Sequence, residues 1–318
     1  MQNLRTLKAV SFLSFLLLLC ATTAFAGEQD HNPPAPKARG ATTESPSKVV
    51  FPAVPPNELV REVVDNELHA RDEGSFMYRD RRQTPKGSNT KEMIETKDGI
   101  VARLLMVNDQ PLTPQQRQAD DERLQNLLLH PDLQAKKKKE QQQDEDRVKK
   151  MFREFPNAFI YQYDGIENSP LGEVIRMTFH PNPKFEPPSR ETSVFKAMDG
   201  KLWVDLKERR LVKIEATLFR GVNFGWGILG HLDKGGHFFV SQSRVGPDRW
   251  EATDMNIQFT GKALLFKTIN LQQVEHLTNF HRVPDGLTLA QGIELLKKNP
   301  NEVAESKSAA ASAPAARQ

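Results

Sequence analysis

A glycine-rich segment in the second half of the chain brings together several side-chain types that can do chemistry. Residues 225–230 read Gly-Trp-Gly-Ile-Leu-Gly and match the G-x-G-x-x-G spacing of dinucleotide-binding loops. That motif acts between a strand and a helix of a βαβ unit, because the helix N-terminus then holds the pyrophosphate. Here the segments on both sides alternate like antiparallel strands. The sequence therefore favours a connecting loop over a nucleotide site.

Three possible metal ligands follow in the same segment. His231, Asp233 and His237 carry the imidazole and carboxylate groups that bind zinc. A catalytic zinc needs three protein ligands and an open position, and no H-E-x-x-H or other recognised spacing accompanies these residues. The alternative is an exposed polar loop. We keep the three residues as weak candidates for a metal site and expect no cofactor.

The sequence contains no recognisable motif for a catalytic nucleophile or for an acid–base pair. No G-x-S-x-G motif is present, and the only cysteine, Cys20, lies in a leader segment. The carboxylates of Asp205, Glu215, Glu251 and Asp254 lie in the predicted strands, and alternation places most of them on the polar face. The sequence therefore predicts a protein without enzymatic activity, and a metal-dependent hydrolase is the third alternative.

Large aromatic side chains are the remaining feature that could bind a ligand. They either fill an ordinary core or line an apolar binding face. Phe224 and Trp226 lie in the glycine-rich segment, where a core has less need of them, so we expect them at the lip of a binding face. The candidate ligand-binding residues are Trp203, Phe219, Phe224, Trp226, Phe238, Trp250 and Phe259.

The segment 159–280 predicts the sheet that would position these side chains. In the hairpin 200–219, Leu202 and Val204 alternate with Lys201 and Trp203, a period of two that indicates a strand buried on one side. Similar segments recur along the chain and give about ten strands or more with few helices. Open sheets of this width curl. The predicted fold class is α+β, with a curled antiparallel half-barrel sheet covered by helices.

Helical segments flank this sheet. Asn57 is a favourable N-cap for a short amphipathic helix, and residues 113–116 carry a capping-box pattern with proline at the first helical position. The charged run 136–147 is expected in solvent. Apolar residues at helical spacing in 148–155 predict a further amphipathic helix that ends before Pro156.

The two ends of the chain predict export. Residues 1–26 combine Arg5 and Lys8 with an apolar run too short to span a bilayer, which is typical of a signal peptide cleaved after Ala26. Leu18 and Leu19 before Cys20 argue against lipidation there. The expected location is the periplasm of a Gram-negative-type bacterium. We expect disorder in 27–56 and 299–318, because their Pro-, Ala- and Ser-rich sequences bury too little apolar area.

Between these ends we expect a single half-barrel domain, 57–298, with a charged helical insertion at about 112–155. The net charge of +3 falls by two when Arg5 and Lys8 leave with the leader. The near-neutral balance gives no case for a nucleic-acid partner, which needs a basic face. No segment after the leader has the length and apolarity of a transmembrane helix.

The order of elements resembles the outer-membrane lipoprotein-sorting superfamily. This superfamily contains the lipoprotein carriers, the lipid-sensing periplasmic regulators of sigma factors and an uncharacterised exported bacterial branch. The residues that carry the resemblance are Asn-Asp-Gln-Pro-Leu-Thr-Pro at 108–114, Gly-Glu-Val-Ile-Arg-Met-Thr-Phe at 172–179 and the hairpin strands in 200–215. It implies a half-barrel with an apolar cavity for acyl chains and no enzymatic activity. The chain departs from the carriers in its charged insertion and in the glycine-rich loop 221–236.

These observations lead to two principal hypotheses of function. The first is a periplasmic, cell-envelope binding protein that shelters a lipid or lipoprotein acyl group in an apolar half-barrel, as a carrier or a sensor. Its partner would be a lipid or an acylated protein. The alternative is an envelope scaffold whose sheet is filled by its own side chains. In that case the charged run 136–147 and the tails would contact a protein partner.

Overall fold

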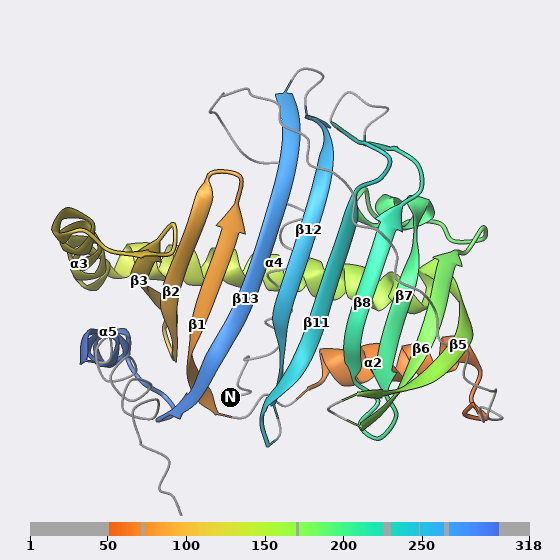
Figure 1. Cartoon of the computed structure of the whole chain (residues 1–318), viewed down its shortest axis with the longest axis horizontal. Helices are drawn as coiled ribbons and strands as arrows, with labels where there is room; N and C mark the ends of the chain where they lie inside the picture. The colour runs from red at the N-terminus through yellow and green to blue at the C-terminus, as the bar shows by residue number, and fades with distance from the viewer. Residues whose placement is uncertain are drawn as a thin grey trace, which may run out of the picture.

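One large antiparallel sheet organises the protein (Figure 1). The computed structural model describes residues 51–70, 74–169, 172–224, 230–247, 249–263 and 267–298. The sheet has 13 strands in the order β4-β3-β2-β1-β13-β12-β11-β8-β7-β6-β5, and the short strands β9 and β10 extend from β12. The sheet is not closed, which confirms the predicted α+β half-barrel.

The strands alternate along the chain with few helical elements. The strands are β1 (Ser75–Thr84), β2 (Gly87–Thr96), β3 (Gly99–Val107), β4 (Gln110–Pro111), β5 (Phe159–Ser169), β6 (Gly172–Pro181), β7 (Met198–Asp205), β8 (Leu211–Leu218), β9 (Val222–Phe224), β10 (Gly230–Leu232), β11 (His237–Gly246), β12 (Arg249–Ala263) and β13 (Lys267–Val283). The helices are α2 (Pro56–Leu68), α3 (Pro114–Leu129), α4 (Pro131–Ala158), the 3-10 helix η2 (Glu191–Ala197) and α5 (Leu289–Lys298).

Strands from opposite ends of the chain meet in the middle of the sheet. β1 pairs with β13, and the register places Asp80 opposite Leu277 and Arg82 opposite Glu275. The N-terminal strands β1 to β3 therefore extend the same sheet that β5 to β13 build. Hydrogen bonds along this seam make the residues from β1 to β13 one continuous structure.

Strand β12 passes through a glycine without a break, because it continues from Arg249 through Gly261 to Ala263. A Cβ at Gly261 would lie 2.1 Å from the backbone oxygen of His231 on β10. The glycine therefore allows the β10 backbone to approach β12 closely, and it does not form a turn.

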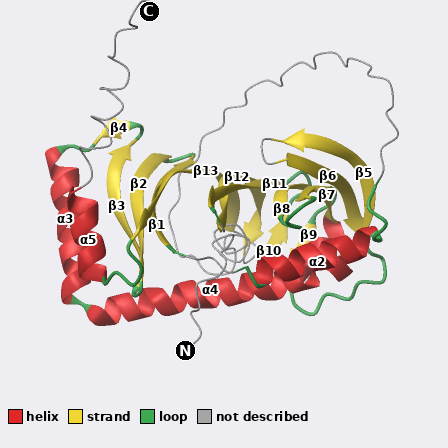
Figure 2. Cartoon of the chain, turned by 90° about the horizontal axis from the view of Figure 1, so that it is seen from below, coloured by secondary structure: helices red, strands yellow, loops and turns green. Residues whose placement is uncertain are grey.

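Helices α2 and α4 cover one face of the sheet. Figure 2 shows α4 running along the open side of the curved sheet with α2 beside it. We call the face toward these helices the inner face and the opposite one the outer face. A continuous inner core joins the two helices to the strands, and its members include Leu59, Phe155, Phe179, Leu218 and Ile257.

Helices α3 and α5 cover the other face at the β1–β3 end. A second apolar cluster joins Ile94 and Val101 of the strands to Leu124 of α3 and Ile293 of α5. Gly292 allows the close approach of α5, because a Cβ there would lie 2.6 Å from the methyl group of Thr96. The two ends of the sheet are therefore covered from opposite sides.

The predicted helix boundaries are partly confirmed. Thr113 Oγ1 accepts a hydrogen bond from the backbone N–H of Gln116, and the Gln116 side chain accepts one from the backbone N–H of Thr113, so the capping box of α3 is present. Asn57 is not an N-cap. Its amide instead donates to the backbone oxygens of Pro156 and Phe159 at 3.3 and 3.2 Å, and it joins α2 to the end of α4.

The charged run belongs to a single long helix. α4 extends from Pro131 to Ala158, and the expected end before Pro156 is wrong. A proline in the last turn removes only one intrahelical hydrogen bond, so the helix tolerates it there. At about 1.5 Å per residue, such a helix is long enough to follow the whole open side of the sheet. None of the described helices has the length and apolarity needed to cross a bilayer.

The predicted leader and tail lie outside the described residues, and so does most of the predicted linker. The described residues begin within that linker, at Phe51. Phe51 stacks on Tyr163 of β5 with ring centroids 5.2 Å apart, and Tyr163 Oη donates to the backbone oxygen of Val54 at 2.6 Å. Residues 51–54 therefore pack against the sheet.

A buried ion pair fastens α2 to the start of β8. Glu67 is 2% exposed and accepts hydrogen bonds from Arg210 Nε and the backbone N–H of Leu211, both at 2.8 Å. Glu67→Ala is expected to lower the free energy of unfolding by about 3 kcal/mol, because the buried Arg210 guanidinium loses its counter-charge. Urea unfolding followed by circular dichroism measures this loss.

The matched control is Glu62→Ala on the same helix. Glu62 is largely exposed and lies 4.0 Å from Arg209. Its removal is expected to change stability by less than about 1 kcal/mol. Equal effects of the two substitutions would contradict the role given to the buried pair.

Candidate binding site on the inner face of the half-barrel

Apolar side chains form a row across the inner face of the central strands. Strand register places Ala216 of β8 opposite Phe238 of β11, Phe238 opposite Ile257 of β12, and Phe259 opposite Leu271 of β13. Residues that pair directly across antiparallel strands project from the same face. We call these five residues the apolar row. Four of them are buried, and Leu271 is partly buried.

One end of the inner face is filled by the protein's own aromatic rings. Phe155 of α4 packs on Phe159 and Phe179 of β5 and β6 and on Phe195 of η2, with ring centroids 5.0, 5.6 and 6.1 Å away. Phe159 and Phe179 are themselves 4.8 Å apart and edge-to-face, a favourable arrangement for aromatic pairs. This end of the half-barrel is therefore an ordinary packed core.

The other end of the inner face is polar, and most of its side chains are buried, although that of Arg82 is 42% exposed. Met255 and Ile257 of the inner core pair with Glu275 and Gln273 of β13, and Glu275 pairs with Arg82 of β1. These polar residues consequently share the face of the apolar row. We use the name polar cluster for Tyr78, Asp80, Arg82, Glu95, Arg249, Glu251, Gln273 and Glu275.

Arg249 is the best-bonded member of the polar cluster. It is 4% exposed, and its Nε donates to Glu251 Oε1 at 2.7 Å. Its Nη2 donates to Glu95 Oε1 at 2.9 Å, and its Nη1 donates to the backbone oxygen of Gly74 at 3.0 Å. The guanidinium also lies 5.0 Å from the ring centre of Phe76. One cation thus serves two buried carboxylates.

Asp80 is bonded much less completely. It is 5% exposed, and its Oδ1 is buried without a hydrogen-bond partner among the described residues. Burial and the negative charge of Glu275 raise the pKa of Asp80 to about 6, while Arg82 and Lys91 act in the opposite direction. Burial also raises the pKa of the neighbouring Tyr78 hydroxyl far above its usual range. The protein therefore holds Asp80 in surroundings that disfavour its charged form.

Arg82 is the second incompletely bonded residue of the cluster. Its Nη2 donates to Glu275 Oε1 at 3.1 Å, and Gln273 Nε2 donates to the other oxygen of Glu275 at 2.8 Å. The Nε atom of Arg82 is buried and has no hydrogen-bond partner in the described part of the chain. A buried hydrogen-bond acceptor on Asp80 and a buried donor on Arg82 are thus both left without partners.

The aromatic residues proposed as ligand contacts lie in different places. Phe238 and Phe259 belong to the inner core, and Phe224 packs partly buried against it. Phe219 is 40% exposed beside Arg220. Trp226 lies outside the described residues.

Trp203 lies on the outer face. It pairs with Lys213, whose Nζ lies 3.9 Å from the ring centre, and its Nε1 donates to Glu167 Oε2 at 3.0 Å. Its strand alternates as predicted, but this alternation carries the ring away from the inner face.

Trp250 is 5% exposed near the start of β12. It donates to Glu208 Oε2 at 2.8 Å and lies beside Arg210 and Arg244. It is not a member of the inner core.

Two of the three metal candidates meet, and the third lies elsewhere. His231 Nε2 is 3.3 Å from Asp233 Oδ1, and His231 Nδ1 is 2.6 Å from Asn223 Oδ1. His237 instead borders a groove on the outer face. Within the described ranges, no group of three or more His, Cys, Asp or Glu side chains is arranged to hold a metal ion.

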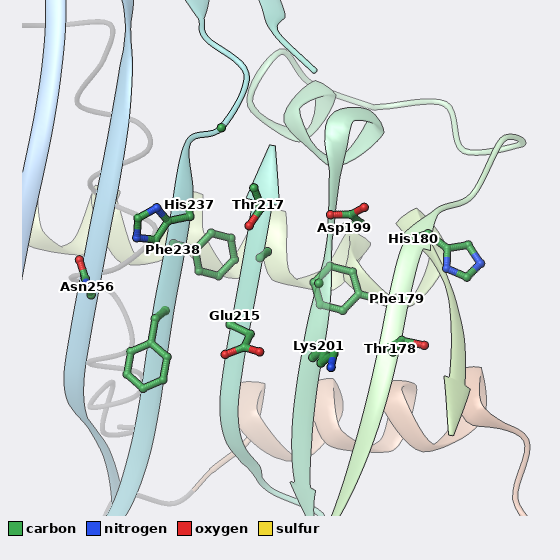
Figure 3. A pocket seen from close by; sticks show the side chains of 14 residues that line it. Thr178, Phe179, His180, Asp199, Lys201, Glu215, Thr217, His237, Phe238 and Asn256 are labelled. Atoms are coloured by element: carbon green, nitrogen blue, oxygen red, sulfur yellow. The ribbon is translucent and has the colours of Figure 1, made fainter. Parts of the chain in front are cut away.

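The outer-face groove has a volume of about 780 Å³ and crosses β6, β7, β8, β11 and β12. Figure 3 shows Lys201, Glu215 and His237 on neighbouring strands, with the helices behind the sheet. Lys213 and Lys201 pair with carboxylates nearby, at 3.3 Å to Glu215 and 3.9 Å to Asp164. The groove is lined by side chains of mixed charge, and these lysines already pair with carboxylates, so this groove is a weaker candidate than the inner face.

Sequence reasoning missed the polar cluster. Glu251 was expected on the polar face of a strand, but it is 4% exposed and accepts a hydrogen bond from the buried Arg249. A signal for this cluster was present in β1. Residues 78–82 read Tyr-Arg-Asp-Arg-Arg, so charged side chains project from both faces of the strand. In the sheet, β1 has a neighbouring strand on each side. Such a strand leaves charges buried unless other elements pair with them.

Two solved structures are similar to the chain. A LolA superfamily protein from Nitrosomonas europaea is 10% identical over 73% of this chain and 96% of that chain, with a TM-score of 0.26. A DUF1329 family protein from Desulfovibrio piger ATCC 29098 is 11% identical over 74% of this chain and 97% of that one, with a TM-score of 0.29. No protein-family model and no curated protein matches the chain. Matches at these TM-scores carry no argument about function, so the site is interpreted from its own side chains.

Proposed function

We propose that the protein is a cell-envelope binding protein that shelters the acyl chain of a lipid or an acylated protein on its inner face. The observation that carries this proposal is the apolar row, which extends from the aromatic core toward the polar cluster on one curved face. Burial of each methylene group in such surroundings contributes about 0.8 kcal/mol. The leader sequence at 1–26 supports export to the envelope.

Helix α4 provides the cover for this face. Its C-terminal half is anchored, since Val148, Met151 and Phe155 are buried against the sheet and its neighbours. Its N-terminal half carries the exposed lysines 136–139 and crosses the open side near the β1–β3 end (Figure 2). A cover that is apolar at one end and charged at the other suits a ligand with an apolar chain and a polar end.

The second candidate function is an envelope scaffold with a filled core. The aromatic packing of Phe155, Phe159 and Phe179 favours it, because that end of the half-barrel leaves its rings in mutual contact. The polar cluster does not favour it, since a scaffold gains nothing from buried polar atoms without partners.

The decisive experiment is extraction of the mature protein, purified from its native envelope, with organic solvent, followed by mass spectrometry of bound lipid. We expect lipid in stoichiometric amount, and we expect lipid-free protein to take up a fluorescent fatty acid. If the protein carries no lipid and takes up no fluorescent fatty acid, the binding proposal is wrong and the scaffold function is favoured.

Leu271→Gln tests the apolar row directly. Leu271 is partly buried on the inner face of β13, so the substitution removes apolar contact area without opening the core. We expect the dissociation constant for the fluorescent fatty acid to rise about tenfold, in line with the loss of one leucine side chain from an apolar contact. Titration by fluorescence measures this change.

Val274→Gln is the matched control. Val274 lies on the same strand, is also partly buried and projects from the outer face. Its substitution is expected to leave the dissociation constant unchanged. Equal weakening by both substitutions would remove the support for binding at the inner face.

A further inference from the structure

Buried polar atoms in folded proteins almost always have hydrogen-bond partners, so the two exceptions in the polar cluster need an explanation. Asp80 Oδ1 lacks a donor and Arg82 Nε lacks an acceptor among the described residues. Arg249, in the same cluster, donates to two carboxylates and a backbone oxygen. The buried Arg249 thus has its hydrogen bonds completed, whereas the buried Asp80 and the buried Nε atom of the partly exposed Arg82 each lack a partner among the described residues.

The two residues lie on the same strand and the same face. Asp80 and Arg82 are separated by one residue of β1, which places them about 7 Å apart along the strand. Asp80 presents an acceptor and Arg82 presents a donor. Lys91 of β2 pairs with Asp80, and Glu275 of β13, which pairs with Arg82, acts on Asp80 through its charge. A ligand that satisfies both residues must carry a donor and an acceptor joined by a short linker.

The apolar row adjoins these residues. Glu275, which binds Arg82, pairs with Met255, and Gln273 pairs with Ile257. Two residues further along β13, Leu271 pairs with Phe259. A molecule whose polar end reaches Asp80 and Arg82 therefore has apolar side chains along the path of its tail.

We propose that Asp80 and Arg82 form a headgroup subsite for a zwitterionic amphiphile, in which an ammonium group donates to Asp80 Oδ1 and a phosphate oxygen accepts from Arg82 Nε. This inference rests on the proposed function, because the acyl tail occupies the apolar row. The chemical class is a phosphoethanolamine-type lipid. The subsite distinguishes between lipid headgroups by hydrogen bonding and charge. The apolar row contributes affinity by burying the acyl chain.

The test compares three probes that have the same single acyl chain. They are lysophosphatidylethanolamine, lysophosphatidylglycerol and monoacylglycerol, each titrated into lipid-free protein by displacement of the fluorescent fatty acid. We expect the wild-type protein to bind the ethanolamine probe about tenfold more tightly than the glycerol probe. We expect the monoacylglycerol to bind most weakly, since it has neither an ammonium group nor a phosphate.

Two substitutions separate the two contacts. Asp80→Asn is expected to remove the preference for ethanolamine over glycerol, because the amide has no charge. Arg82→Gln is expected to remove the preference of both phosphate-containing probes over monoacylglycerol. Glu92→Gln, on β2 and paired with Arg79 on the outer face, is the matched control and should change neither preference.

The outcomes distinguish this inference from the function on which it rests. Equal binding of all three probes to the wild-type protein would overturn the headgroup subsite and leave acyl binding intact. Failure of all three probes to bind would overturn acyl binding itself. Glycerophosphoethanolamine, which has no acyl chain, is expected to compete only weakly, and tight binding of it would instead identify a site for the free phosphate ester.

The stability of Asp80→Asn gives a readout that a purely structural aspartate would not give. The pKa of Asp80 in the folded protein, about 6, lies above its ordinary value of 3.8, so the folded state disfavours the carboxylate above pH 6. We expect Asp80→Asn to unfold at a higher urea concentration than the wild-type protein at pH 8, and the difference to disappear near pH 4. Lower stability of the variant at pH 8 would show that Asp80 has a structural role and would overturn the subsite.

Discussion

Arg249→Ala is expected to lower the free energy of unfolding by about 3–5 kcal/mol, because it leaves two buried carboxylates without their shared cation. Glu251 is 4% exposed and Glu95 is 8% exposed, so water cannot replace the guanidinium. The loss also removes the hydrogen bond to the backbone oxygen of Gly74, which holds the start of β1 against β12. Urea unfolding at pH 7, followed by tryptophan fluorescence, measures the difference.

Arg244→Ala is the matched control for this prediction. Arg244 pairs with Glu208 from the turn between β7 and β8, but the Arg244 side chain is 41% exposed. Solvent screens such a pair, and we expect a change of less than about 1 kcal/mol. If Arg249→Ala were no more destabilising than Arg244→Ala, the polar cluster would have to be open to water.

Phe179→Ala is expected to cost about 3–5 kcal/mol of stability through the cavity it leaves. The ring is 1% exposed and packs between Phe155, Phe159 and Tyr161, with centroid distances of 5.6, 4.8 and 6.1 Å. These rings come from α4 and from β5, so the cavity also loosens the anchored end of α4. Thermal and urea unfolding should both shift.

Phe219→Ala is the comparison for Phe179→Ala, since Phe219 is 40% exposed just after β8. It is expected to change stability by less than about 1 kcal/mol, in keeping with its small buried area. A loss for Phe179→Ala of similar size would mean that the aromatic end is loosely packed. In that case the aromatic residues at this end of the inner face would again be candidates for contact with a ligand.

The two substitutions also probe the two ends of the inner face separately. Phe179 lies at the end that the protein fills with its own rings, and Arg249 lies at the polar end. Between them the apolar row carries the proposed acyl contacts. The missing hydrogen bonds of Asp80 and Arg82 lower the stability of the folded protein. Such a loss of stability is common at functional sites.

Local patterns in the sequence were sufficient for the individual strands and one helix start. The alternation of Leu202 and Val204 with their neighbours predicted the β7–β8 hairpin, and the Thr113–Gln116 capping box predicted the start of α3. These features depend on residues close in the chain, because a strand's period and a helix cap are set by local geometry. The α+β class followed from the number of such strands and the scarcity of helices.

Tertiary structure alone decided which strands are neighbours and which face each side chain occupies. Alternation gives a period of two and does not name a partner, so it could not show that β1 pairs with β13. For the same reason Trp203 was expected near the ligand face, although it lies on the outer one. The polar cluster depends on contacts between β1, β2, β12 and β13, and only the assembled sheet brings Asp80, Arg82 and Glu275 onto one face.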